Sequence, residues 1–161
     1  MAGVSIKLDV ADLGAATALV ARIANFEPDE LMASIGALGE SQTRRRISDE
    51  KTSPDGAPWA PNRRGGDILV ETGQHLLQSI AFTATATETE WGAGWEHAHV
   101  HQEGAVIVPK SAKALAVPVP GGGVRLAAKV TIPARPFVGL SEENGEEILE
   151  LVTDILTGLI Q

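Results

Sequence analysis

Residues 132–141 read I-P-A-R-P-F-V-G-L-S, and the sequence changes character across this stretch. On its N-terminal side, from residue 80 onward, short runs of β-branched and apolar residues are separated by Gly, Pro and polar residues, which is typical of strands and turns. On its C-terminal side, residues 142–160 carry apolar residues at helical spacing with acids between them. The stretch therefore marks the point where a sheet is predicted to pass into a closing helix.

The prolines of this stretch predict a rigid connector. Pro133 and Pro136 fix their own φ and disfavour helical backbone in the residues before them. Phe137 is the large apolar side chain of the connector, so we expect it to be a core anchor. Arg135 lies between the two prolines, and we predict that it forms a directed salt bridge.

Helices are predicted in the first half of the chain. Alternation over residues 4–10 indicates a short half-buried strand, and apolar residues spaced three and four apart predict a helix over 11–25. Pro-Asp-Glu at 28–30 is typical of the first turn of a second helix. Thr72 can cap a short third helix that carries Leu76 and Ile80.

The second half of the chain predicts an antiparallel sheet. Thr at every second position over 80–90 indicates one strand with a wet face. Further short strands are expected near residues 91–95, 106–108, 115–117 and 124–132. The fold class is therefore α+β, a single domain over 1–161 with N-terminal helices and a C-terminal helix over 142–160 packed on the sheet.

A long irregular loop is expected over residues 49–66, which hold several Pro and Gly residues. Its Ser-Pro-Asp-Gly sequence, ending at Gly56, is typical of a tight turn. Trp59 lies between two prolines. We expect the loop to be extended and mobile in the free subunit, and to become ordered on a neighbour through Trp59.

Three of the four histidines fall in H-A-H-V-H-Q-E-G, residues 97–104. On an extended strand, the spacing of two puts His97, His99 and His101 on one face. Three ligands on one strand seldom converge on a metal, so neither a metal nor another cofactor is predicted. A subunit contact, a wet strand face and adventitious binding of nickel or zinc stay open.

Composition excludes several classes of function. The chain has no Cys, which removes thiol chemistry and disulfides. Neither a nucleophile motif nor a phosphate-binding loop occurs, so no enzyme is expected. We also expect no signal peptide and no membrane span, and therefore a soluble protein that is made in the cytoplasm.

Charge is unevenly distributed along the chain. The net charge of −8 disfavours general adhesion to nucleic acid. Between Gly104 and Ser141 there are basic residues and no acids, whereas from Glu142 onward there are acids and no bases. The two blocks are either solvated faces of different sign or complementary patches that attract each other within one subunit or between neighbours.

Several motifs occur in a fixed order. They are Asp55-Gly56-x-x-Trp59-x-Pro61, Leu69-x-x-Thr72-Gly73-x-x-Leu76-x-x-Ser79-Ile80, Ala98-x-x-His101-Gln102-x-Gly104 and Ile132-Pro133-Ala134-Arg135-Pro136-Phe137-Val138-Gly139. Over residues 10–160 the chain resembles the phage virion morphogenesis family, or tail completion proteins, which includes the Mu-like G protein and the P2-like S protein.

The resemblance implies a structural protein of a tailed phage or prophage virion. Such a protein acts in tail completion and head–tail joining, as a subunit of a homo-oligomeric ring at the neck. Its expected partners are its own copies, other neck and tail proteins, and DNA that passes through the lumen without sequence-specific binding. The alternatives are a tail terminator, a head-closure protein or a minor tail protein, and, from another class, a His-based metal-binding protein.

Two sets of candidate residues follow. Those expected at an oligomer or partner interface are Trp59, Arg63, Arg64, Lys110, Arg125, Lys129, Arg135, Glu146, Glu147 and Glu150. Those that the resemblance gives a structural role are Gly56, Trp59, Thr72, Gly73, Leu76, Ser79, Ile80, His101, Gln102, Gly104, Pro133, Arg135, Pro136 and Phe137.

Overall fold

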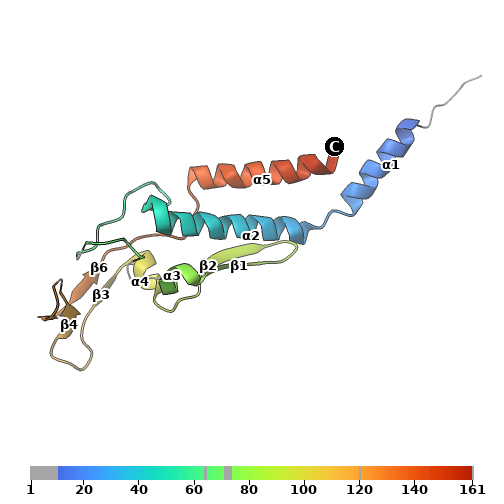
Figure 1. Cartoon of the computed structure of the whole chain (residues 1–161). Coiled ribbons are helices and arrows are strands. Elements are labelled where there is room, and N and C mark those ends of the chain that lie inside the picture. The colour runs from blue at the N-terminus through green and yellow to red at the C-terminus, as the bar shows by residue number, and fades with distance from the viewer. Residues whose placement is uncertain (1–10, 64, 71–73, 120, 161) are drawn as a thin grey trace, which may run out of the picture.

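Two long helices lie side by side along the molecule (Figure 1). They are α2 (Pro28–Arg45) and α5 (Glu142–Ile160) in a computed structural model that describes residues 11–63, 65–70, 74–119 and 121–160. The first helix, α1 (Ala11–Ala24), projects beyond one end of this pair and contacts α5. The strand expected over 4–10 lies outside the described residues.

Helix α2 begins and ends as its sequence predicts. Pro28 lies in its first turn, and the acids that follow favour the positive end of the helix dipole. The helix runs on into one π-helical turn, η1 (Arg46–Glu50). Lys51 then adopts a left-handed conformation (φ 57°), and its backbone N–H donates to the carbonyl of Arg46 over 3.0 Å.

A β-hairpin packs against α2 on the side opposite α5. Strands β1 (Ile80–Ala84) and β2 (Thr89–Ala93) pair antiparallel. The prediction of a single strand over 80–90 is wrong, because the chain turns back at Thr85, whose N–H donates to the Glu88 carbonyl over 2.8 Å. Alternating Thr continues through the turn, so alternation alone did not reveal it.

The strands do not form one sheet. Strand β3 (Ala105–Ile107) pairs with β6 (Val130–Ile132), and β4 (Leu115–Pro118) pairs with β5 (Val124–Ala127). Together they form an arm that extends from the end of the molecule opposite α1 (Figure 1). We call this segment, residues 105–119 and 121–132, the β-arm. The strand predicted over 124–132 is interrupted between β5 and β6.

The described residues thus form an α+β fold whose layers are α5, α2 and the hairpin β1–β2 (Figure 1). The expectation that the C-terminal helix packs on a sheet is wrong, because α5 packs on α2 instead. Two short helices, α3 (Gln74–Gln78) and α4 (Ala98–Glu103), cover the end of α2 near the β-arm. The buried apolar core lies there and consists of Ile47, Trp59, Leu76, Ile80, Ala98 and Phe137.

Two glycines let the hairpin approach α2 closely. A Cβ on Gly39 would lie 2.5 Å from the ring of Trp91, and one on Gly36 would lie 2.4 Å from the ring of Phe82. Both glycines are buried, although glycine weakens a helix interior. Packing against the aromatic rings therefore outweighs helix propensity at these two positions.

This contact predicts opposite effects for two equivalent substitutions. Gly39→Ala should lower the free energy of unfolding by about 1–3 kcal/mol, because the Trp91 ring must move. Gly145→Ala in α5, where nothing lies within 4 Å of the new methyl, should raise it by about 0.5–1 kcal/mol. Urea unfolding measures both, and an unchanged or raised stability of Gly39→Ala would contradict the close packing.

Candidate functional site

The connector between the β-arm and α5 is held by one buried guanidinium. Arg46 is 1% exposed, and its Nη1 donates to the carbonyls of Phe137 (3.2 Å) and Gly139 (2.7 Å). Its Nη2 donates to the side-chain oxygen of Asn144 in the first turn of α5. Burial lowers the pKa of Arg46 from its ordinary value. Arg46 thus joins the end of α2 to the connector and to the start of α5.

Gln102 and Gly104 hold the connector from the other side. The Gln102 Oε1 accepts from the backbone N–H groups of Phe137 (3.0 Å) and Val138 (3.1 Å), and its Nε2 donates to the Val138 carbonyl (3.0 Å). Gly104 has φ 76°, and a Cβ there would lie 2.7 Å from the backbone nitrogen of Ala134. The His-Gln-x-Gly segment therefore lies against the connector and requires Gly at its last position.

Arg135 does not form the salt bridge that the sequence suggested. It is 6% exposed, and its Nε and Nη2 donate to the carbonyl of Ala60 over 3.0 and 2.8 Å. No acid pairs with it among the described residues, and burial lowers its pKa. The guanidinium instead fixes the loop on the connector through a neutral acceptor.

Trp59 is buried within its own chain, whereas we expected it to contact a neighbour. It is 5% exposed within its own chain, and its Nε1–H donates to the carbonyl of Pro136 over 3.2 Å. The Trp59 backbone N–H donates to the Lys51 carbonyl, and Gly56 closes the expected tight turn by donating to Ser53. The loop is therefore anchored on its own core by Trp59, and the prediction that it orders only on a neighbour is wrong.

The histidines do not share a strand face. Residues 98–103 form helix α4, so the prediction of a strand is wrong. On a helix a spacing of two turns each residue about 200° from the one before, so His99 lies on the side opposite His97 and His101, both of which contact the Trp95 ring. His97 and His99 are exposed, and His101 lies inward. No group of three possible metal ligands occurs in the described part of the chain.

His101 lies between aromatic and cationic groups. Its ring stacks on Trp95, with 5.7 Å between centroids, and its buried Nδ1 has no hydrogen-bond partner among the described residues. The pKa of His101 is lowered, first by burial and then by the charges of Arg135 and His97. His101 is therefore neutral at pH 7.

A cavity of about 980 Å³ opens beside these residues. It lies between the loop that follows Trp59 and the β-arm, and we call it the arm cavity. Among the described residues its lining includes Arg63, Arg125 and Arg135, together with His75 and His101 and a single acid, Asp67. The rest of the wall is mostly apolar, with contributions from Leu69, Leu76, Trp95, Val117, Val130 and Ile132. The arm cavity therefore combines cations with apolar surface.

The outer face of α5 has the opposite charge. Leu149, Leu156 and Ile160 are exposed by 66%, 44% and 62%. Exposed Glu146 and Glu150 adjoin this apolar strip. Glu147 differs, because its carboxylate accepts from Gln42 (2.7 Å) and pairs with Arg45 (2.9 Å), both of which lower its pKa. Glu147 therefore fixes α5 on α2 within one chain.

The remaining candidate residues are dispersed. Leu76 and Ile80 are each 1% exposed, and Ser79 donates to the Leu76 carbonyl over 2.8 Å. Lys110 and Lys129 are exposed on the β-arm, and Pro133 lines the arm cavity. Arg64, Thr72 and Gly73 lie outside the described residues.

Comparison with known proteins identifies the chain. A family model described as the phage virion morphogenesis family matches residues 12–157. The chain belongs to this family. No curated protein and no solved structure matches it.

Membership in the phage virion morphogenesis family makes this a phage assembly protein and associates it with the virion. In the described part of the chain, no helix is long and apolar enough to cross a membrane. The family motifs contain four residues that fix the connector: Gln102, Gly104, Arg135 and Phe137. Arg46 lies outside the motifs and fixes the connector as well.

Sequence reasoning missed Arg46, Asn144 and the exposed leucines of α5. Arg46 is the last of three consecutive arginines, a pattern that is typical of a solvated helix end, so its burial could not be expected. Asn144 could have been found from its position three residues after Ser141, which caps α5. The Ser141 Oγ accepts a hydrogen bond from the Asn144 N–H over 3.2 Å. Leu149 and Leu156 could have been found by plotting α5 as a helix, because they lie seven residues apart and therefore share a face.

Arg46→Met tests the role of this guanidinium. The substitution keeps most of the side-chain volume but leaves three buried acceptors without their donor, so we expect a loss of about 3 kcal/mol or more in unfolding free energy. Arg45→Met is the matched control: it removes partly exposed ion pairs and should cost roughly 1 kcal/mol. Equal losses in urea unfolding would contradict the assignment.

The lowered pKa of His101 predicts a pH dependence of stability. Because the unfolded chain binds the proton more readily, the stability from neutral His101 is fully present above the ordinary value of 6.5 and is lost as pH falls through the lower folded pKa. The thermal midpoint should therefore fall between about pH 7 and pH 5. His101→Gln should reduce this fall, and His99→Gln, at an exposed position of α4, should leave it unchanged. A His101→Gln profile that matches wild type would contradict the assignment.

Proposed function

We propose that this protein is a structural subunit of a tailed phage or prophage virion that assembles with its own copies into a ring at the head–tail junction, where it completes the tail. The proposal combines the family with one physical observation. That observation is the large apolar surface that a single chain leaves exposed.

The apolar surface that a single chain leaves exposed is spread over several elements. Large apolar side chains are exposed on α1, α5, the β-arm and the connector, and include Val20, Ile23, Val106, Val108, Val124, Leu126, Leu140, Leu149 and Ile160. Exposed apolar side chains that gather on one element, as on α5 and the β-arm, are typical of protein–protein contacts.

The shape supports contacts between unlike surfaces. The β-arm and α1 extend from opposite ends of the α2–α5 pair (Figure 1), so a patch at one end of a copy can meet a different patch on the next. Head-to-tail contacts of this kind close into rings when the rotation between copies allows. The net charge of −8 also suits the wall of a DNA path that must not hold the passing duplex.

The alternative roles in the virion are those of a tail terminator, a head-closure protein and a minor tail protein. Each of these would also require the chain to associate with its own copies. A His-based metal-binding protein is less well supported, because His99 lies on the other side of α4 from His97 and His101, and no group of three possible ligands occurs in the described residues. Metal analysis of untagged protein after chelation tests it, and a stoichiometric metal that survives chelation would favour it.

Self-association has a direct test. Light scattering of the purified protein, coupled to size exclusion, should give a mass several times 16.8 kDa, and electron microscopy of the same fraction should show closed rings. High salt should lower the mass, because the contact includes charged groups. A monomer at every concentration would contradict the proposal.

The position in the virion is tested by labelling virions with a gold-conjugated antibody against the protein. Label at the neck supports head–tail joining, and label along the tail or at its distal end contradicts it.

A further inference from the structure

The arm cavity combines charged and apolar side chains in a way that the fold itself does not explain. Arg125 lies on β5 directly opposite Val117 of β4, and both line the cavity. Arg63 lies across from them on the loop, and Arg135 forms the buried wall. Asp67 is the single acid among the described lining residues, so these residues favour an anionic group that also carries apolar surface.

The outer face of α5 has that chemistry. Leu149, Leu156 and Ile160 follow one another at spacings of seven and four, so they form one stripe along the helix. Glu146, Glu150 and Asp154 follow at spacings of four and form a parallel acidic row beside it. α5 carries no basic residue, so no cation on the helix competes for these acids.

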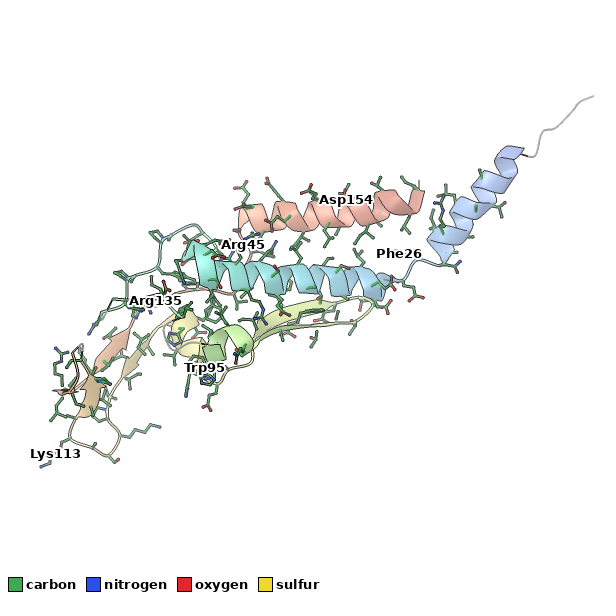
Figure 2. All side chains as sticks on the ribbon, in the orientation of Figure 1. Phe26, Arg45, Trp95, Lys113, Arg135 and Asp154 are labelled. Carbon is green, nitrogen blue, oxygen red and sulfur yellow. The ribbon has the colours of Figure 1, made fainter. Side chains whose placement is uncertain are left out.

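The α5 of the same chain cannot reach the arm cavity. Gln42 donates to Glu147 (2.7 Å) and to the Asn144 carbonyl (3.1 Å), and Arg45 pairs with Glu147 (2.9 Å), so α5 is fixed along α2. In Figure 2, Asp154 lies on the upper surface of α5, away from α2, while Lys113 lies at the far tip of the β-arm. The two surfaces therefore face different neighbours.

We propose that the arm cavity of one copy receives the outer face of α5 from a second copy. Leu149 and Leu156 pack against the apolar wall, and Glu146 and Glu150 pair with Arg63 and Arg125 at the rim. The proposal rests on self-assembly and specifies its contact. Such a contact is heterologous, because it joins two different surfaces, and it repeats from copy to copy.

The arrangement follows the usual construction of protein interfaces. Arginine is enriched at such interfaces, and apolar side chains occupy the centre while charges lie at the rim. The rim pairs orient the copies and are screened by salt. His101 lines the same cavity, and its buried Nδ1 has no hydrogen-bond partner among the described residues.

A charge exchange tests the contact. Arg125→Glu and Glu150→Arg each place like charges together in the proposed pair, and we expect each to raise the concentration at which half the protein is assembled by at least about tenfold. The double variant restores opposite charges and should recover most of that loss. Both residues are exposed in the single chain, so folding, followed by circular dichroism, should be unchanged. Arg63→Glu is a second variant on the cavity side.

Matched controls make the same charge changes elsewhere. Lys113→Glu alters the β-arm away from the cavity lining, and Glu88→Arg alters the exposed turn of the hairpin. Both should assemble as the wild type does. Assembly is measured by light scattering over a range of protein and salt concentrations.

The outcomes separate this contact from the proposed function. If wild type assembles and Arg125→Glu, Arg63→Glu and Glu150→Arg all assemble equally well, or if the double variant shows no recovery, the contact is wrong while self-assembly stands. If Arg125→Glu weakens binding of a DNA duplex and leaves self-association unchanged, the cavity is a nucleic-acid site and the contact is wrong. If charge exchange controls a dimer or an open filament and no ring forms, the contact stands and the ring function fails.

Discussion

The structure depends on one buried guanidinium. Arg46 ends α2, and it donates to the two connector carbonyls of Phe137 and Gly139 and to Asn144 of α5. The chain between the β-arm and α5 is short and carries two prolines, so the positions of both elements follow from how this segment is held. Without these bonds, three acceptors at the junction would lose their donor, and the connector would no longer be tied to α2 through Arg46.

The same junction relates the two surfaces that we propose to meet between copies. On one side the connector continues β6 and the wall of the arm cavity, and on the other it begins α5. The relative position of the cavity and the acidic face of α5 is therefore set inside each subunit, by Arg46, Gln102 and Glu147. A fixed angle between a receptor surface and its complement within one subunit is what a closed ring requires.

Much of the fold could be predicted because long amphipathic helices have an unambiguous period. α1, α2 and α5 begin within a residue of their expected positions. Short elements could not be predicted. Helix α4 has only six residues, too few for a helical period to show, so the histidine stretch was assigned to the wrong class, and alternating Thr continued through the turn after Ala84. The partners of Arg46 and Arg135 were also beyond prediction, because both donate to backbone carbonyls distant in sequence, and every residue type carries a carbonyl.

The absence of Cys from the chain allows a direct test of how copies join. Thr131→Cys places a thiol in the lining of the arm cavity, and Thr153→Cys places one on the outer face of α5 between the exposed leucines. A disulfide requires the two Cα atoms to approach within about 7 Å. If the outer face of α5 enters the cavity of the next copy, mild oxidation of the double variant will give a ladder of covalent oligomers, and each single variant will not. Assembled protein that stays free of intermolecular disulfides under the same oxidation would contradict this mode of assembly.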